Sequence, residues 1–419
     1  MLKAISLFTG IGGLDFGFEA AGFDTVAAVE MDPVSCRTIR LNRKWPVLEG
    51  DIHKIRSQEI LAAAGVRAGE VDVLIGGPPC QPFSKSSYWV NGDARRLDDP
   101  RADTLTAYLR VLRDTKPRMF LLENVPGLVY KGKDEGMQHL IRGIDVINKE
   151  ARTNYRLSYR ILNAVGFGVP QMRERVFLVG HRDGAMFDFP RHTHGTPSEN
   201  ELLGSDLEPY RTAWDALGDL PADPKDPSLA MGGYWSALLP SIPEGQNYLW
   251  HTNRGGGRPL FGWRTRYWSF LLKLAKTQPS WTIQAQPGSS IGPFHWRNRK
   301  LSAQEMCRLQ CFPDGLIFDC GRTDVQRMLG NAVPSLVTEV LAWEMRRQFL
   351  GERGQPNALK LLPPVRESVP APERVRPVPK EYHHMIGTYD DHPGTGKGAG
   401  AKRRGKADAQ VSLFPDAAE

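Results

Sequence analysis

The sequence contains no run of about 18 apolar residues, so no membrane-spanning helix is expected. Cysteine is also scarce, because the 419 residues include only five, an odd number: Cys36, Cys80, Cys307, Cys311 and Cys320. This usage fits a reducing compartment better than a disulfide scaffold. The N-terminal MLKAISLF runs directly into TGIGG and lacks the pattern of a signal peptide. These absences leave a globular protein of ordinary composition, 41% hydrophobic and 24% charged.

Acidic residues are missing from one stretch. Residues 245–304 contain no Asp or Glu, but nine Lys or Arg residues and five Trp residues. Basic charge interleaved with aromatic rings is typical of a nucleic-acid surface, and the net charge of +7 points the same way. The alternative is a solvated basic face over a small Trp-rich core, and the charge pattern alone does not separate the two.

The first 190 residues alternate apolar runs with helical patterns, as βαβ units do. Near-continuous runs of Val, Ile and Leu predict strands buried on both faces, and hence an α/β fold with a mostly parallel sheet. The expected strands cover 3–8, 25–30, 71–77, 118–125 and 173–180, and the clearest helices cover 13–22 and 325–349.

The alternation stops near residue 188. From there to about 250 the chain is rich in Pro, Gly, Asp and Trp, without periodicity. After Gly351 it becomes Pro-rich and then rich in Gly and Lys, which predicts a disordered basic tail over 351–419.

The glycine-rich turn in LFTGIGGLDFGF follows the first expected strand and opens a helix, as in nucleotide-cofactor sites. It departs from G-x-G-x-x-G because Asp15 occupies the last position, which disfavours a dinucleotide. Glu30 ends the second strand, where a carboxylate can accept both ribose hydroxyls, and Asp51 ends another strand within reach of a purine amino group. A ribose and an adenine without a pyrophosphate favour S-adenosylmethionine over NAD. The alternative is that the glycines merely turn the chain.

Cys80 follows the strand VDVLIGG within the stretch PPCQPFS. Pro78 and Pro79 fix two φ angles and remove two backbone donors, so they present the thiol on a stiff stem. Most lone cysteines are small buried hydrophobes, but this position after a strand favours a nucleophile. A metal ligand would need a partner at C-x-x-C spacing, which is absent.

Glu123 ends the apolar strand RMFLLENV, where partial desolvation should raise its pKa and let it hold a proton. A cap for the next helix is the alternative. Arg173 and Arg175 begin the strand RERVFLVG, and alternation should place them on one face. Two arginines beside a cleft can serve an anionic ligand or hold a carboxylate; the alternative is a surface ion pair.

These motifs, in this order, resemble the DNA (cytosine-5) methyltransferase family. The resemblance rests on FTGIGG, PPCQPFS, ENV, QMRER, RKLSAQEMCRLQCFPD and LGNAVP, and it covers about 1–190 and 279–345. It implies a Rossmann-like S-adenosylmethionine-dependent methyltransferase domain formed by 1–190 and 322–350. It also implies a target-recognition domain, with the late helical motif, over 191–321. FSKSS lacks the Gly that often follows the cysteine loop.

The resemblance also assigns roles. Cys80 would add to C6 of cytosine, Glu123 would hold N4 and N3, and Arg175 would hold O2. The implied catalytic residues are Cys80, Gln81, Ser84, Glu123, Arg173 and Arg175. The implied cofactor residues are Phe8, Gly10, Gly12, Gly13, Glu30, Asp51, Pro78 and Asn331. Expected DNA contacts are Ser86, Arg95, Arg96, Arg254, Arg258, Arg264 and Arg266, and we hypothesise that 85–100 closes as a lid over an extruded base.

The implied function is sequence-specific methylation of cytosine C5 in duplex DNA, with S-adenosylmethionine as cofactor and no metal. The chain would act as a cytoplasmic monomer in a bacterium, as the modification enzyme of a restriction-modification system whose endonuclease is a genetic partner. The alternative is a tRNA cytosine-5 methyltransferase, which the same motifs would serve. The long basic and aromatic variable stretch favours DNA.

Overall fold

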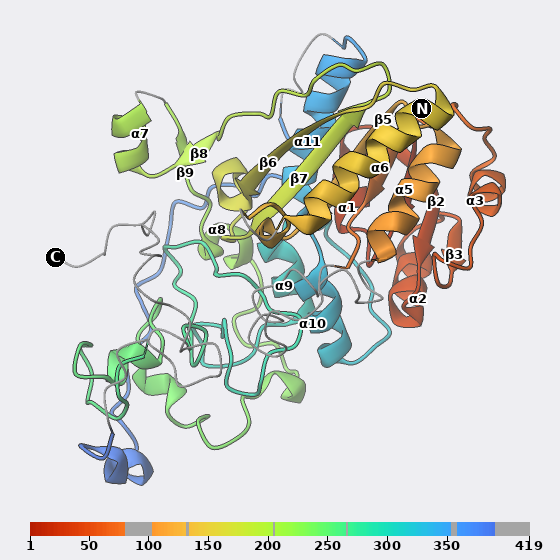
Figure 1. Ribbon diagram of the computed structural model, residues 1–419. Coiled ribbons are helices and arrows are strands. Elements are labelled where there is room, and N and C mark those ends of the chain that lie inside the picture. The colour runs from red at the N-terminus through yellow and green to blue at the C-terminus, as the bar shows by residue number, and fades with distance from the viewer. Residues whose placement is uncertain (80–102, 131–133, 204–205, 265–266, 353–357, 390–419) are drawn as a thin grey trace.

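A computed structural model describes residues 1–79, 103–130, 134–203, 206–264, 267–352 and 358–389 (Figure 1). The strands are β1 Leu2–Leu7, β2 Phe23–Glu30, β3 Val47–Glu49, β4 Val73–Gly76, β5 Met119–Asn124, β6 Arg156–Asn163, β7 Glu174–His181, β8 His194–Gly195 and β9 Glu208–Pro209. The α-helices are α1 Gly13–Ala20, α2 Pro33–Asn42, α3 Ser57–Ala64, α5 Asp103–Thr115, α6 Glu135–Ala151, α7 Pro197–Leu203, α8 Ala213–Leu217, α9 Ala303–Leu309, α10 Arg322–Asn331 and α11 Ser335–Phe349. The short 3₁₀ helices are η2 Pro126–Val129, η3 Ala164–Phe167, η4 Pro227–Leu229, η5 Leu239–Ser241, η6 Tyr248–His251 and η7 Lys380–Met385.

Seven strands form one sheet in the order β3-β2-β1-β4-β5-β7-β6. All neighbours are parallel except at β7, which runs antiparallel to both β5 and β6. The prediction of an α/β fold with a mostly parallel sheet is therefore confirmed. Because β7 is reversed, its first residues lie at the same edge as the carboxyl ends of the parallel strands, and this edge carries the candidate site.

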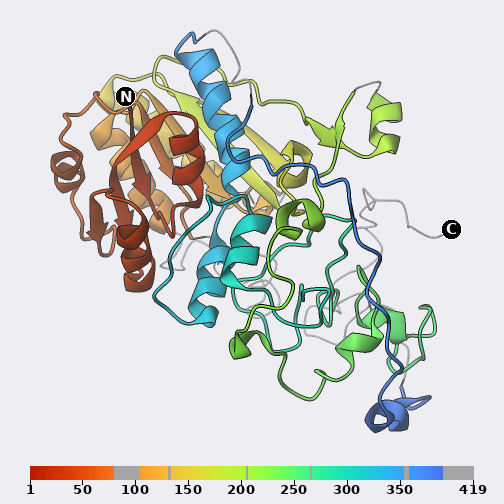
Figure 2. The ribbon, with the colours of Figure 1, turned by 180° about the vertical axis from the view of Figure 1, so that it is seen from behind.

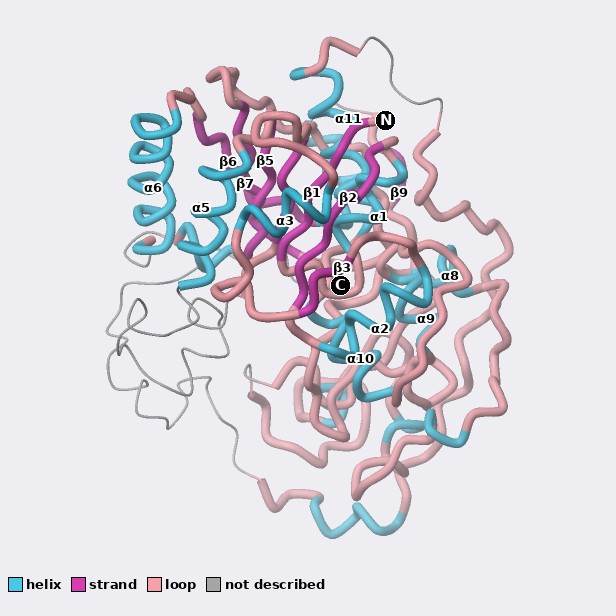
Figure 3. Tube along the Cα trace, turned by 90° about the vertical axis from the view of Figure 1, so that its right-hand side faces the viewer, coloured by secondary structure: helices cyan, strands magenta, loops and turns pink. Residues whose placement is uncertain are grey.

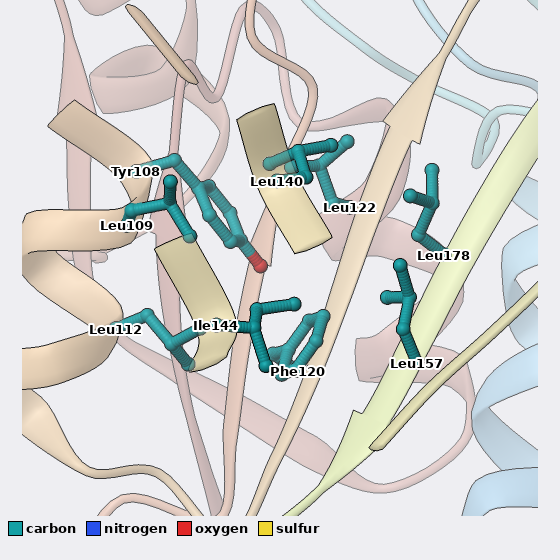
Figure 4. Close-up of a pocket in the computed structure, with 9 residues that line it drawn as sticks. All are labelled: Tyr108, Leu109, Leu112, Phe120, Leu122, Leu140, Ile144, Leu157 and Leu178. Carbon is teal, nitrogen blue, oxygen red and sulfur yellow. The ribbon is translucent and has the colours of Figure 1, made fainter. Parts of the chain in front are cut away.

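Helices cover both faces of the sheet (Figures 1 and 3), which explains why the central strands β4 and β5 are buried along their whole length. One hydrophobic cluster joins the sheet to α3, α5 and α6, and a second joins it to α1 and α11. An apolar crevice in the first cluster is lined by leucines and aromatic rings (Figure 4). Its one polar side chain, Tyr108, bonds to the carbonyls of Leu74 and Leu121, so the crevice is a feature of core packing.

Helix α11 packs against α1, so the sheet and the helices on its two faces, which we call the sheet domain, draw on two distant parts of the chain. The approach is close: a Cβ added to Gly17 would clash with the hydroxyl of Thr338. The single helix expected over 325–349 was wrong. The chain forms α10 and α11 with a break at 332–334, because Pro334 cannot continue a helix and restricts the residue before it.

The described residues of 206–300 contain little regular structure, as the loops in the lower half of Figure 3 show. They pack around a separate cluster that includes Leu238, Tyr248, Leu260 and Phe294. The late helical motif forms α9, which begins at a capping box between Ser302 and Glu305 and packs with α8 and α10.

The expectation of a disordered tail over 351–419 was wrong for residues 358–389. This segment, which we call the strap, runs from the sheet domain to the 238–294 cluster and ends its described part after η7. Composition hid it because its few apolar residues, such as Leu362 and Tyr382, are separated by prolines and charges. Residues 390–419 lie outside the described part of the chain.

Candidate active site

The turn after β1 has three alternate residues with positive φ: Phe8 at 55°, Gly10 at 58° and Gly12 at 89°. Glycine adopts such angles without a steric penalty, which explains its use in this turn. A Cβ added to Gly10 would meet nothing within 4 Å, so open space adjoins the turn there. Gly13 begins α1, and a Cβ added to it would lie 2.6 Å from the carbonyl of Val333, which brings the last motif beside the first.

Glu30 at the end of β2 holds this turn. Its Oε2 accepts a hydrogen bond from the backbone N–H of Gly10 at 2.7 Å, and its Oε1 accepts from Met31 and Asp32. Burial raises the pKa of Glu30, while the backbone hydrogen bonds lower it. Each carboxylate oxygen can still accept from a ribose hydroxyl.

Asp51 follows β3, and its Oδ1 accepts from the N–H of His53 at 3.0 Å. Since β1, β2 and β3 are parallel neighbours, the glycine turn, Glu30 and Asp51 share one sheet edge. Asn331 is the last residue of α10 and is exposed, two residues before Val333, which packs beside Gly13. The cofactor residues expected from the sequence are thus brought to one end of the domain.

The stem of the cysteine loop lies beside Glu123. A Cβ added to Gly77 would be 2.9 Å from Oε2 of Glu123, and Nδ2 of Asn124 donates to the carbonyl of buried Pro78 at 3.3 Å. Asn124 was not expected to have a role, although it is the middle letter of ENV. Cys80, Gln81, Ser84, Ser86, Arg95, Arg96 and Arg266 lie outside the described residues, as does the whole of the expected lid, 85–100.

Glu123 is 7% exposed and forms an ion pair with Arg175, whose Nε lies 2.8 Å from Oε1. Burial raises the pKa of Glu123, and the positive charges of Arg175 and Arg173 oppose this shift. Desolvation is the larger effect, so the carboxyl binds a proton more readily than an exposed glutamate does.

Arg173 and Arg175 have different surroundings. Arg173 is 1% exposed; its Nη2 donates to the carbonyl of Gly330 at 2.7 Å and its Nη1 to the carbonyl of Ile283 at 3.3 Å. Burial and the neighbouring Arg175 lower the pKa of Arg173, whereas Glu123 raises it. Arg173 therefore ties the start of β7 to the residue before Asn331. These long-range carbonyl partners have no signal in the sequence.

Beneath the glycine turn, Asp15 on α1 is fully buried and accepts hydrogen bonds from Ser6 and Thr25, each at 3.0 Å. Ser6 in turn accepts from Thr9 in the turn at 3.0 Å. Burial raises the pKa of Asp15 to about 7, although the two hydroxyls lower it. In the sequence, Asp15 was informative only as the residue that disfavours a dinucleotide, and its supporting role beneath the turn was not predicted.

The basic stretch divides into two groups. Arg254, Arg258 and Arg264 are exposed, and the guanidinium of Arg254 lies 4.0 Å from the centre of the Trp263 ring. In contrast, Lys273, Lys276 and Arg299 are buried. Lys276 pairs with Glu244 at 2.5 Å and Arg299 with Glu305 at 2.7 Å. The absence of acids within 245–304 thus overstated the basic surface, because acids outside the stretch neutralise part of it.

Among the described residues, no group of three or more His, Cys, Asp or Glu side chains could hold a metal ion. Cys307 and Cys311 are both buried within hydrophobic clusters. Likewise, no helix in the described ranges is long and apolar enough to cross a membrane.

A family model described as C-5 cytosine-specific DNA methylase matches residues 2–347. The type II methyltransferase M.SacI of Streptomyces achromogenes is 41% identical over 379 residues, which cover 84% of this chain and 95% of that protein. M.AquIA of Picosynechococcus is 46% identical over 235 residues, covering 55% of this chain and 92% of that protein.

Solved structures show the same fold. A candidate DNA modification methyltransferase encoded within an E. coli prophage has a TM-score of 0.58 at 23% identity and covers 84% of this chain and 100% of its own. A mutant of DNMT2 from Spodoptera frugiperda has a TM-score of 0.54 at 18% identity, covering 84% and 100%. With the sheet, the glycine turn and the Glu123–Arg175 pair in place, the matched region shows that the chain belongs to the C-5 cytosine-specific DNA methylase family.

Proposed function

We propose that this DNA cytosine-5 methyltransferase modifies a specific sequence in duplex DNA through a covalent adduct between Cys80 and C6 of the target cytosine. The observation that carries the proposal is the position of Glu123. Its buried carboxyl lies beside Gly77 in the stem of the cysteine loop and is paired with Arg175. One side chain that can hold a proton therefore lies next to the segment that presents the nucleophile.

The proposed cofactor is S-adenosylmethionine, on which the family depends. The residues fit this group: open space adjoins Gly10, and Glu30 lies at the end of β2 within hydrogen-bond distance of that turn. In our assignment Glu30 holds the ribose and Asp51 the adenine amino group. Phe8, Gly12, Gly13, Pro78 and Asn331 enclose the remainder. When bound, the sulfonium supplies an electrophilic methyl group.

The proposed reaction begins when the Cys80 thiolate bonds to C6. The C5–C6 π electrons then form a C4–C5 double bond, and the C4–N3 π pair becomes an N–H bond as Glu123 donates its proton to N3. The Glu123 carboxylate also accepts a hydrogen bond from N4, and the product is an enamine whose C5 is nucleophilic. Arg175 contacts O2 and Arg173 holds the Glu123 region against Gly330, while Gln81 and Ser84 act near the thiol. The C4–C5 pair of the enamine would form the bond to the methyl carbon that the sulfonium supplies, and the S–CH₃ electrons would stay on sulfur as a neutral thioether. N3 returns its proton to Glu123 as the C4–N3 double bond re-forms. A water molecule then removes the C5 proton, and the electrons of that C–H bond form the C5–C6 double bond as the Cys80 thiolate leaves C6.

The target base must leave the duplex stack to reach this site, which costs a few kcal/mol. We assign phosphate and base contacts to Ser86, Arg95, Arg96, Arg254, Arg258, Arg264 and Arg266. Residues 1–190 and 322–350 form the proposed catalytic domain, and 191–321 form the proposed target-recognition domain and late helical motif. Arginine can read guanine O6 and N7, although the same side chain also binds phosphate.

We further propose that the enzyme acts as a monomer in the bacterial cytosol, as the modification enzyme of a restriction-modification system whose endonuclease is a genetic rather than a physical partner. Type II methyltransferases among the relatives support this context. A tRNA substrate is the weaker alternative, because the matching family is described as a DNA methylase and the similar relatives are type II methyltransferases.

The test compares methyl transfer to duplex DNA and to tRNA, followed by bisulfite sequencing to locate the modified cytosine. Duplex DNA containing 5-fluorocytosine should trap a covalent complex, since fluorine cannot leave C5 as a proton does. Cys80→Ser should abolish both turnover and trapping while sparing cofactor binding. Cys320→Ser, at a half-buried cysteine away from the site, is the matched control. Substantial turnover by Cys80→Ser would overturn the covalent mechanism.

A further inference from the structure

The strap, residues 358–389, links the sheet domain to the 238–294 cluster. In Figure 2 the blue segment after α11 passes the green α8 and descends to η7 at the lower right. Four sets among its contacts join it first to the sheet domain, then to the α8 region, and finally to the 238–294 cluster.

The first contact is with Glu339 of α11, which is fully buried. Its Oε1 accepts from the N–H of Lys360 at 2.7 Å and its Oε2 from the N–H of Leu361 at 3.0 Å. Burial raises the pKa of Glu339, and the two N–H groups lower it. A buried carboxylate satisfied by the strap backbone fixes the start of the strap on the sheet domain.

The second contact is with α8. The backbone N–H of Arg366 donates to Oδ1 of Asp215 at 2.8 Å, and its side chain pairs with Asp219 at 2.7 Å. In the third, Glu373 meets a buried pair: its N–H donates to Glu244 at 2.8 Å, and its carboxylate lies 3.4 Å from Lys276. Both contacts join the strap to residues 206–300, which we call the variable region, through charge-assisted hydrogen bonds, which are stronger than neutral ones.

The fourth contact inserts Tyr382 of η7 into the 238–294 cluster, where it is fully buried. Its ring stacks on Trp235 with centroids 5.8 Å apart, and its hydroxyl donates to the carbonyl of Tyr234 at 2.5 Å. The rings of Trp235 and Phe261 have centroids 5.3 Å apart. Those of Phe261 and Tyr248 have centroids 5.7 Å apart.

This chain of rings ends at the exposed arginines. The hydroxyl of Tyr248 donates to the carbonyl of Arg264, and Nη1 of Arg258 lies 3.1 Å from Nε2 of His383, the residue after Tyr382. The end of the strap is therefore linked to the exposed arginines in two ways. The packed rings from Tyr382 to Tyr248 lead to Arg264, and His383 makes a direct polar contact with Arg258.

We propose that the strap contributes to target recognition together with the variable region. In this proposal Tyr382 and His383 are positioning residues that hold residues 248–264 in the orientation that engages DNA. The inference rests on the proposed DNA contacts of Arg254, Arg258 and Arg264. It adds that a segment after the last catalytic motif, outside the variable stretch, sets the affinity for DNA.

The experiment measures KM for duplex DNA, kcat, and the Kd of S-adenosylmethionine in Tyr382→Ala and Tyr382→Phe. The alanine variant should raise the KM for DNA at least tenfold and leave the cofactor Kd within twofold. The phenylalanine variant keeps the ring and should recover most of the loss. Tyr155→Ala is the matched control, because Tyr155 is also a buried tyrosine whose hydroxyl donates at 2.5 Å to a carbonyl, that of Pro117 in the sheet domain.

His383→Ala provides a second variant, since His383 is only partly buried and its loss should not unfold the protein. It should raise the KM for DNA a few-fold without changing kcat. An unchanged KM for DNA in both His383→Ala and Tyr382→Ala would overturn the inference. It would also be overturned if the KM for DNA in Tyr382→Ala rose only as much as the cofactor Kd of that variant and the KM for DNA of Tyr155→Ala. If Arg254→Ala, Arg258→Ala and Arg264→Ala also leave DNA binding unchanged, the proposed DNA surface itself fails; if they weaken it, only the role of the strap fails.

Discussion

The sheet domain and the variable region maintain their backbones by different means. In the sheet, ladders of backbone hydrogen bonds satisfy the peptide groups, and side chains are left to pack. Between 238 and 294, polar side chains satisfy some of the peptide groups instead. Asn247 donates to the carbonyl of Trp268, and Tyr248 donates to that of Arg264.

This difference has a functional consequence. A side-chain change in the sheet alters packing or chemistry, but the backbone hydrogen bonds between strands still fix the path of the chain. A side-chain change in the variable region can redirect the backbone, because the side chain is itself a backbone partner. The two regions should therefore respond differently: substitutions at the sheet edge should act on kcat, and substitutions in the variable region should act on DNA affinity.

The largest expected effect is at Glu123. Glu123→Gln keeps a hydrogen-bonding group beside Arg175 but cannot transfer a proton to N3, so kcat should fall by about 10²- to 10⁴-fold. The KM for DNA should change little. Steady-state methylation kinetics measure both quantities, and Glu174→Gln, an exposed neighbour of Arg175, is the control. A rise in DNA KM with unchanged kcat would break the assignment of chemistry to the sheet edge.

A second prediction concerns stability of the sheet domain. The folded pKa of Asp15 is about 7 and its ordinary value is 3.8. The native state therefore binds the proton more tightly than the unfolded state, and stability falls as pH rises from about 4 through about 7. At about 1.36 kcal/mol per pKa unit, the loss by pH 8 is on the order of 4 kcal/mol.

Asp15→Asn removes this titration and should flatten the free energy of unfolding across that pH window. Denaturant unfolding at several pH values measures the slope. Asp24→Asn, at an exposed carboxylate on β2, should keep the wild-type slope. An unchanged slope in Asp15→Asn would show that other groups govern the pH dependence.

The smallest of these three effects is expected at Arg254 in the variable region. Arg254→Ala removes an exposed charge held over Trp263, so the KM for DNA should rise about tenfold and the salt dependence of binding should decrease by about one counterion. Binding titrations at several salt concentrations measure this, with exposed Arg156 on the edge strand β6 as the control position. A fall in kcat at saturating DNA would contradict the prediction that the variable region acts on DNA affinity alone.

The sequence predicted most where interactions are local. The apolar runs that became β4 and β5 were recognised because both faces of these strands are buried. Strand β6 was missed, since its edge position leaves residues such as Tyr159 exposed and mixes polar with apolar letters. Motif order identified the family, and Glu123 lies where it was expected.

Long-range partners could not be predicted in the same way. The carbonyls that Arg173 binds belong to Ile283 and Gly330, more than a hundred positions along the chain, and carbonyls carry no residue-specific signal. The strap was likewise invisible, because Tyr382 acquires its role only from Trp235 and its neighbours in three dimensions. Charge counting failed at Lys276 for the same reason, as its partner Glu244 lies just outside the acid-free stretch.

The packing of α11 against α1 also constrains how the protein is made. Gly13 emerges from the ribosome early, whereas the segment that contacts it, around Val333, is synthesised near the end of the matched family region. At about 5–20 residues per second, the interval between the two is roughly 16 to 64 s. During that time the apolar face of α1 lacks the helix that covers it in the folded protein. The final packing of α1 can therefore form only after α11 has been synthesised, and until then this face is a binding site for a chaperone.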